Sequence, residues 1–329
     1  MTKKKKTQLP KELNKKNNFS KIIISFSATI IIILVIFIFV KKEKPIFDGK
    51  KAFDELVTQV DFGPRISGTK GHDKTQKYLT DKLKQYADLV SDQNFEYVDK
   101  RDSTKIYKGS NIVASFNISP DVKERVLLAA HWDSRPFADN DPDSNNHKLP
   151  VPAANDGASG VAVLLEMARL FSISKPDVGV DIVFFDLEDI GDESKDIPEA
   201  TRNPFGIGSV MFVKNNPAYR PAFGILLDMV GDKNLRIPKE VYSNERAKYV
   251  IDKVWDAAKD VNATAFKDEI GVPIMDDHIV FLQHNIPVID LIHTPFPSYW
   301  HTVNDTPDKC SNESLQQVGN VLVEVIYNE

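Results

Sequence analysis

The sequence predicts an α/β protein with a three-layer α/β/α architecture around a mixed, largely parallel central sheet, preceded by one transmembrane helix. Short apolar runs such as RVLLAA and VDIVFF alternate with helical stretches. Strands that are apolar on both faces, and that are separated by helices, favour a mainly parallel sheet covered on both sides. A long apolar run near the N-terminus predicts the membrane helix.

The composition bounds the number of domains and the kind of site. The chain has 329 residues, 42% of them hydrophobic, and a net charge of -5, enough for one large domain or at most two. Acidic residues outnumber basic ones and no basic stripe is interleaved with aromatic residues, so no nucleic-acid partner is expected. No obligate protein partner can be read from the sequence. Because Cys310 is the only cysteine, a metal site would consist of His, Asp and Glu.

Residues 22–40 form an uninterrupted run of apolar or small residues, long enough as a helix to cross a bilayer. A buried core helix and a cleaved signal peptide are the alternatives. The run is apolar on all faces, is longer than a usual signal segment, and is followed by no A-x-A-like site. The lysine excess in residues 1–21 predicts a cytoplasmic basic tail. Residues 45–329 are then expected to lie outside the cytoplasm, in a periplasmic or similar compartment.

The soluble part alternates predicted helices and strands. Residues 74–89 form a predicted amphipathic helix, and the runs at 111–116 and 125–130 are predicted strands. Next comes a helix at 160–171, because Val161, Leu164, Leu165 and Ala168 share one face. Later elements follow the same pattern, with strands at 180–185, 223–227 and 288–292 and helices at 246–261 and 313–326.

Metal-capable or acid–base residues follow three of the predicted strands. Functional groups in parallel sheets gather beyond the carboxyl ends of the strands. The three sets are His131 after residues 125–130, Asp186, Glu188 and Asp189 after residues 180–185, and Asp228 after residues 223–227. Three such endings together favour a functional site.

Each motif alone also has a structural explanation. Asp133 could orient a metal-binding His131, but a hydrogen-bonded structural histidine would show the same H-x-D pattern. Asp156 could cap the helix that follows it or bind a metal. The pair Glu188–Asp189 could belong to an exposed acidic loop. Beside a buried strand end, two adjacent carboxylates need a cation or a proton, and one could bind metal while the other acts as a base.

Two segments near the C-terminus complete the candidate set. Asp276, Asp277 and His278 are consecutive, and Trp300 precedes His301 in a loop rich in proline and aromatic residues. This loop is expected to form the wall of a pocket, which favours His301 as a ligand or substrate contact. The polar loop 139–150 is expected to be mobile, and its role cannot be read.

The order His131, Asp156, Glu188–Asp189, Asp228, His301 resembles the zinc aminopeptidase family M28, and within it the glutaminyl cyclases (glutaminyl-peptide cyclotransferases). The likeness extends from about residue 50 to the C-terminus. It is carried by FGPRISGT, AAHWDSR, FFDLED, LLDMVG and MDDHIVFLQHNIPVIDLIHTPFPSYWHT. The DDH-x-x-F-L and F-P-x-x-W-H-T segments are particular to the cyclase branch.

The resemblance implies that residues 45–329 are an M28-like, zinc-dependent catalytic domain. It also implies a role for each site residue. The zinc ligands are Asp156, Asp189 and His301, the general acid/base is Glu188, the residues that handle protons and position the substrate are Asp228 and Asp276, and Trp300 lines the pocket. Three protein ligands and one open position are typical of catalytic zinc.

Four features depart from the animal cyclases. Asp189 stands where they have Glu, Leu187 where Gly is common, and Asp290 where they have His; the loop 190–206 lacks a Trp. These differences bear on the shape of the pocket rather than on the metal site.

Two activities are compatible with these ligands, both on peptide or protein N-termini. A cyclase would use one zinc ion to convert N-terminal glutamine to pyroglutamate with release of ammonia. An M28-type aminopeptidase would hydrolyse N-terminal residues with two zinc ions, the second bound by His131 and Asp228 with Asp156 as a bridge. Trp300 and Asp276 favour the cyclase. A non-catalytic binding ectodomain is disfavoured because no metal ligand is missing.

Overall fold

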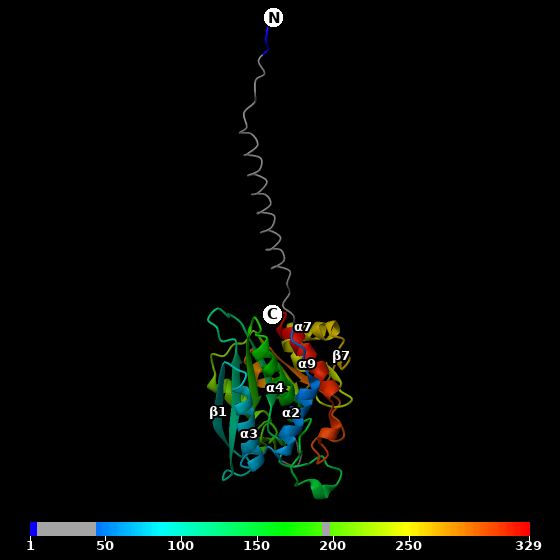
Figure 1. The fold of residues 1–329 in the computed structure, drawn as a ribbon. Helices are drawn as coiled ribbons and strands as arrows, with labels where there is room; N and C mark the ends of the chain where they lie inside the picture. The colour runs from blue at the N-terminus through cyan, green and yellow to red at the C-terminus, as the bar shows by residue number, and fades with distance from the viewer. Residues whose placement is uncertain (5–43, 193–197) are drawn as a thin grey trace. The chain divides into compact units, whose positions relative to one another are not determined.

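The computed structural model describes residues 1–4, 44–192 and 198–329 (Figure 1). Residues Lys44–Glu329 form one compact unit, which is separate from the segment Met1–Glu43. The predicted transmembrane segment 22–40, and nearly all of the basic tail 1–21, lie outside the described residues, so the anchor stays a prediction. Within the described ranges, no helix combines the length and apolar character needed to cross a membrane.

The compact unit alternates helices and strands. In chain order its elements are α2 (Gly49–Asp61), α3 (Lys70–Leu83), β1 (Leu89–Val98), β2 (Ile106–Phe116), β3 (Arg125–His131), η1 (Ser144–Asn146), α4 (Ala158–Ile173), β4 (Gly179–Phe185), η2 (Glu199–Thr201), α5 (Ile207–Asn215), β5 (Phe223–Asp228), β6 (Ile237–Lys239), α6 (Val241–Arg246), α7 (Lys248–Asp260), β7 (Phe266–Ile270), α8 (His278–Gln283), β8 (Val288–Ile292), η3 (Pro307–Lys309) and α9 (Asn312–Ile326).

A six-stranded sheet in the order β1-β2-β4-β3-β5-β8 forms the centre of the fold. Strands β4, β3, β5 and β8 are parallel neighbours, whereas β2 is antiparallel to both β1 and β4. The predicted mixed, largely parallel sheet is confirmed. Strands β6 and β7 form a separate parallel pair.

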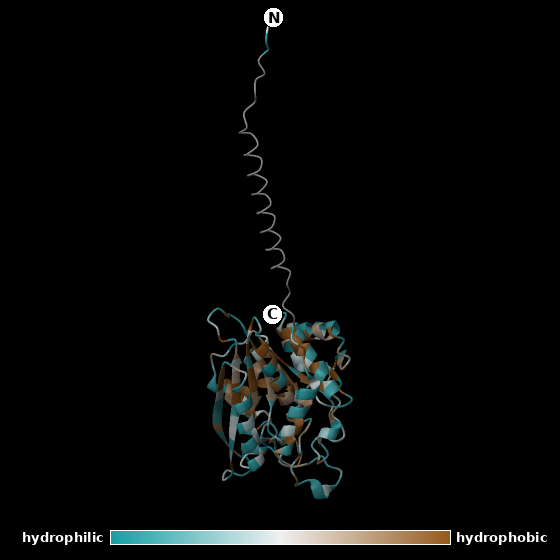
Figure 2. Ribbon diagram, in the orientation of Figure 1, coloured by the Kyte–Doolittle hydropathy of each residue, from teal (hydrophilic) through white to brown (hydrophobic). Residues whose placement is uncertain are grey.

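Helices cover both faces of this sheet. Along β3, Val126 and Leu128 belong to the core cluster that contains residues of α2, α4, α7 and α9. The alternate residues Leu127 and Ala129 pack instead with residues of α5 and α8. Because successive side chains of a strand point to opposite faces, the fold has three layers. Figure 2 shows hydrophobic residues concentrated between these layers.

Several elements differ from the prediction made for the first third of the chain. The helix predicted at 74–89 begins earlier, after the N-cap Thr69, and ends at Leu83. Leu89 instead begins β1, an edge strand whose side chains are mostly exposed or half-buried. Such a strand lacks a continuous apolar run, which explains why the sequence pattern missed it. The helix predicted at 246–261 is confirmed as α7, with α6 directly before it.

Helix α4 approaches the sheet closely at a glycine. A Cβ atom on Gly160 would lie 2.4 Å from the carbonyl oxygen of Leu227 in β5, so a larger residue could not be accommodated without a shift. This contact places the turn before α4, which carries Asp156, beside the carboxyl end of β5.

Candidate active site

Residues from three strand ends meet at the carboxyl edge of the sheet. His131 and Asp228 are the last residues of β3 and β5. Glu188 and Asp189 come shortly after the end of β4 at Phe185, and all four residues are buried or half-buried. The positions agree with the strand-end rule.

Asp186 is the exception among the strand-end residues. Its carboxylate accepts a hydrogen bond from the backbone N–H of Ser110 at 2.7 Å and lies 2.9 Å from Nε2 of His72. The His72 ring in turn packs against Trp132. The prediction that Asp186 belongs with the other strand-end residues is therefore wrong, because His72 and the backbone of Ser110 hold its carboxylate instead.

Asp156, Asp189 and His301 form a group that could hold a metal ion. One donor atom from each lies within 4.8 Å of the others. Nε2 of His301 is 3.5 Å from Oδ2 of Asp156 and 3.4 Å from Oδ1 of Asp189. Among the described residues, Oδ2 of Asp189 is buried without a hydrogen-bond partner. Two buried carboxylates with an orphaned oxygen are costly unless a cation compensates, so this donor set fits zinc.

The backbone around Asp156 is held in place by Asp305. The carboxylate of Asp305 accepts the N–H groups of Asn155 at 2.8 Å and of Asp156 at 3.0 Å. The N-cap of α4 is Gly157, with φ 98° and no side-chain capping bond. The helix-cap interpretation of Asp156 is therefore wrong, because its side chain faces the two histidines instead.

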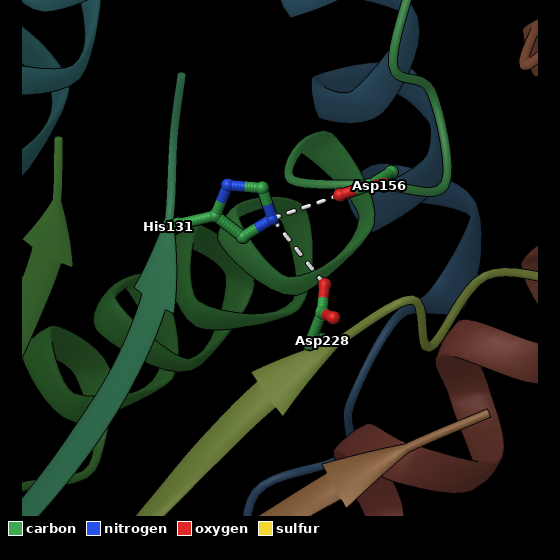
Figure 3. A group of neighbouring side chains, drawn as sticks. All are labelled: His131, Asp156 and Asp228. Carbon is green, nitrogen blue, oxygen red and sulfur yellow. Dashed lines mark hydrogen bonds and ion pairs between the residues drawn. The ribbon is translucent and has the colours of Figure 1, made fainter. Parts of the chain in front are cut away.

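His131 is the centre of a second group of donors, shown in Figure 3. Its Nε2 lies 3.1 Å from Oδ1 of Asp156 and 3.3 Å from Oδ1 of Asp228. On the other side of the ring, Nδ1 is 3.3 Å from Oδ1 of Asp133. His131, Asp156 and Asp228 also meet the distance requirement for a metal site. Because Asp156 belongs to both groups, the arrangement has donors for one ion or two.

Asp133 also orients the acidic pair. Its two carboxylate oxygens accept the backbone N–H groups of Glu188 and Asp189, each at 3.1 Å. Glu188 and Asp189 are only 8% and 1% exposed, so the interpretation as an exposed acidic loop is wrong for this pair. Burial, together with the charge of Asp189 and despite the opposing effect of His131, raises the pKa of Glu188 well above its usual value.

Leu187 has a left-handed backbone, with φ 57°. This conformation favours glycine, which is common at this position in the cyclase motif that the sequence resembles. The Leu187 side chain is fully buried in a small apolar cluster with Phe95, Tyr107, Ile190 and Ile207. That packing offsets the conformational cost of a side chain here.

A cavity of about 320 Å³ opens over these residues. Trp300 forms part of its wall, and its ring stacks on His301 with centroids 3.8 Å apart. The full lining of this cavity consists of Asp156, Glu188, Asp189, Phe205, Asp228, Met229, Pro273, Ile274, Met275, Asp276, Ile292, Phe296, Trp300 and His301. A volume at the small end of ligand pockets suits one amino-acid residue rather than a long segment.

A second set of buried polar residues lies next to Asp276. Nε2 of His278 lies 3.3 Å from Oε2 of Glu240, and Nδ1 lies 3.8 Å from Oδ2 of Asp290. Neither carboxylate oxygen of Asp290 has a hydrogen-bond partner in the described parts of the chain. Burial and the surrounding carboxylates raise the pKa of Asp290 well above its usual value. Asp276, His278 and Asp290 lie close enough to count as a third possible metal group.

Glu240 holds this region together, and its removal gives a testable pH effect. Its carboxylate accepts the N–H groups of Tyr242, Ser243 and Ile274. Burial opposes its ionisation, but His278 and these hydrogen bonds outweigh burial and lower the pKa of Glu240 to about 2. At 1.36 kcal/mol per pKa unit, a fall from 4.5 corresponds to about 3 kcal/mol of stability.

Glu240→Gln is therefore expected to lower the free energy of unfolding by about 3 kcal/mol at pH 7. Because the folded pKa lies below the unfolded one, this stabilisation is complete above about pH 4.5 and is lost as the pH falls toward about 2. Denaturant unfolding at pH 7 and at pH 3.5 measures the difference. Glu245→Gln, on the exposed face of the same short helix, is the control. If wild type and Glu240→Gln differed by the same free energy of unfolding at both pH values, the lowered pKa of Glu240 would be contradicted.

Two residues of the site carried no local sequence signal. Arg135 is fully buried, donates to Oδ1 of Asp189 at 3.2 Å, and forms a bidentate pair with Asp139 at 2.7 Å. Asp139 also lies 3.8 Å from Nδ1 of His301. The loop 139–150, whose role could not be read, thus supplies a carboxylate beside the candidate ligands. In the sequence, the only hint of this role is that Arg135 and Asp139 follow the His131 motif by a few residues.

Comparison with known proteins supports the resemblance. The sequence model of peptidase family M28 matches residues 111–326. A crystal structure of Bacteroides thetaiotaomicron glutaminyl cyclase bound to N-acetylhistamine is 42% identical, with a TM-score of 0.80, over 87% of this chain and 100% of that chain. A Zn-dependent exopeptidase from Parabacteroides distasonis is 38% identical, with a TM-score of 0.81, over 87% of this chain and 100% of that one.

The curated relatives are more distant. Glutaminyl-peptide cyclotransferase of Bos taurus is 25% identical over 245 residues, which cover 65% of this chain and 64% of the bovine protein. The chain thus matches somewhat less than two thirds of that relative's length. The family and the exopeptidase both point to zinc as the metal. Because the family match spans more than half of the residues of this chain, the chain belongs to peptidase family M28.

Proposed function

We propose that residues 45–329 are a zinc-dependent glutaminyl-peptide cyclotransferase, which converts an N-terminal glutamine to pyroglutamate and releases ammonia. The observation that carries this proposal is the small cavity in which Glu188 and a three-residue metal group face Asp276 and Trp300. The similarity to a bacterial glutaminyl cyclase over that protein's whole length supports it.

The proposed metal ligands are Asp156, Asp189 and His301. Zinc bound by these residues would polarise the side-chain carbonyl of the substrate glutamine. Asp133 and Arg135 would keep Asp189 in position, since the first accepts its backbone N–H and the second donates to its carboxylate. Asp305 would do the same for Asp156 through the backbone.

Glu188 is the proposed general acid/base. In the reaction the substrate α-amine forms a bond to the side-chain amide carbon, and the bond from that carbon to the amide nitrogen breaks. Glu188 accepts the proton that the amine loses and returns it to the departing ammonia, so no water is consumed. A buried carboxyl with a raised pKa suits a group that must both accept and return a proton.

Asp228, Asp276 and Trp300 are proposed to position the substrate. Burial raises the pKa of Asp228 to about 7 and also raises the pKa of Asp276. Both carboxyl groups line the cavity and could hydrogen-bond to the α-amine. The Trp300 ring would exclude water from the pocket and fix the orientation of His301.

A two-zinc aminopeptidase is the second candidate. The observation that favours it is the second donor group of His131, Asp156 and Asp228, which shares Asp156 with the first. The similarity to a Zn-dependent exopeptidase also supports it.

The two activities are distinguished by their products. Two peptides that differ only in the first residue, glutamine or leucine, are incubated with the zinc-loaded protein, and both ammonia and free amino acid are measured. We expect ammonia from the glutamine peptide and no leucine from the other. Rapid leucine release, with two zinc ions per chain, would instead establish the peptidase.

A further inference from the structure

An apolar groove adjoins the cavity at the candidate active site. It has a volume of about 390 Å³ and is lined by Arg236, Ile270, Gly271, Val272, Ile274, Thr294, Pro295 and Phe296. Ile274 and Phe296 also line the catalytic cavity. The two spaces are therefore neighbours, and Ile274 and Phe296 line both of them.

The groove exposes large hydrophobic side chains. Ile270 is 57% exposed and Val272 is 51% exposed, and Met275 at the neighbouring cavity is 65% exposed. All three belong to the run IGVPIM, residues 270–275, which contains no charged residue. Contiguous exposed apolar residues of this kind mark binding surfaces.

The backbone of this run is held in place. The N–H of Gly271 donates to the carbonyl oxygen of Lys239 at 2.8 Å, and the N–H of Ile274 donates to Glu240 at 3.0 Å. The charged residue that lines the groove, Arg236, is already paired within the chain. Arg236 donates to the carbonyl oxygen of Thr294 and pairs with Glu269. The groove is thus a preformed surface that favours an uncharged, apolar occupant.

We propose that this groove binds an apolar side chain at the second or third position of the substrate peptide. The inference rests on the proposed function, because a peptide whose first residue fills the small catalytic cavity must leave it past one of the walls. The groove lies next to the cavity at the shared residues Ile274 and Phe296. A peptide in this path would bury Ile270 and Val272.

A second cavity offers a different exit. It has a volume of about 490 Å³, shares Phe205, Met275 and Asp276 with the catalytic cavity, and carries charged side chains including Lys100, Asp192, Glu199 and Arg202. A peptide that left by this path would gain from charged or polar residues after the first. The two exits therefore predict opposite preferences.

The test compares peptide amides that begin with glutamine and carry either leucine or glutamate at position two or three, with glutamine amide as the reference. We expect leucine to raise kcat/KM about tenfold or more over glutamate, as burial of an apolar side chain typically does. Val272→Asp is expected to abolish that preference and to leave the turnover of glutamine amide unchanged.

Val210→Asp is the matched control, because Val210 is 45% exposed and lines the second cavity. It is expected to keep the preference for leucine. If wild type converts glutamine amide without preferring leucine, or if Val210→Asp and not Val272→Asp removes the preference, the groove assignment is overturned. If glutamine amide is not converted at all, the proposed function fails, and this inference fails with it.

Discussion

Glu188→Gln is expected to lower kcat by about 10²- to 10⁴-fold, the usual contribution of a general acid/base, while the zinc content stays unchanged. Glutamine has nearly the same shape as glutamate but cannot accept the proton from the substrate amine. Glu188 lies outside the group formed by Asp156, Asp189 and His301, so its replacement leaves the proposed metal ligands intact.

The measurement combines ammonia release at saturating glutamine peptide with metal analysis of the purified variant. Glu96→Gln, at an exposed position on β1, controls for the loss of one carboxylate elsewhere. Near-normal turnover of the Glu188 variant would refute the acid/base role. Loss of zinc along with activity would show that Glu188 contributes to metal binding instead.

The sequence predicted those parts of the fold whose signal is local. Strands β3, β4, β5 and β8 are almost entirely buried on both faces, so each appears in the sequence as a short, mostly apolar run. Strand β1 is an edge strand with mostly exposed or half-buried side chains, and such strands resemble loops in composition. Helix α2 was not predicted, although Asp48 caps it. Aspartate is common throughout this sequence, so a single aspartate is a weak signal for the start of a helix.

The same distinction holds for the site. His131, Asp228 and the acidic pair after β4 follow apolar strands, so the geometry of a parallel sheet brings them together. Asp186 satisfies the same rule but turns toward His72, a partner more than a hundred residues away along the chain. Arg135 and Asp305 also act through long-range contacts, which span 54 and 149 residues of the chain. Interactions of this kind depend on tertiary packing and leave no periodic pattern in a single sequence.

His301→Ala is expected to weaken zinc binding more than about 100-fold, because even the mutation of a residue that only contacts a metal ligand lowers metal affinity about 10- to 100-fold. Loss of the imidazole leaves the carboxylates of Asp156 and Asp189 close together without a neutral donor. When the metal was at 100 times its dissociation constant, a 100-fold weaker affinity removes about 2.3 of the about 2.7 kcal/mol of zinc-linked stability. Thermal unfolding with and without added zinc therefore tests the assignment independently of activity. His284→Ala, at an exposed position, should bind zinc normally.

His131→Gln extends this comparison to the number of ions. If one ion is bound by Asp156, Asp189 and His301, the His131 variant keeps its zinc and the His301 variant does not. If two ions are bound, with Asp156 as the bridge between the two donor groups, each variant should keep one ion. A pattern in which His131→Gln loses all zinc while His301→Ala keeps it would contradict the ligand assignment, and it would move the catalytic metal to the His131 side of the pocket.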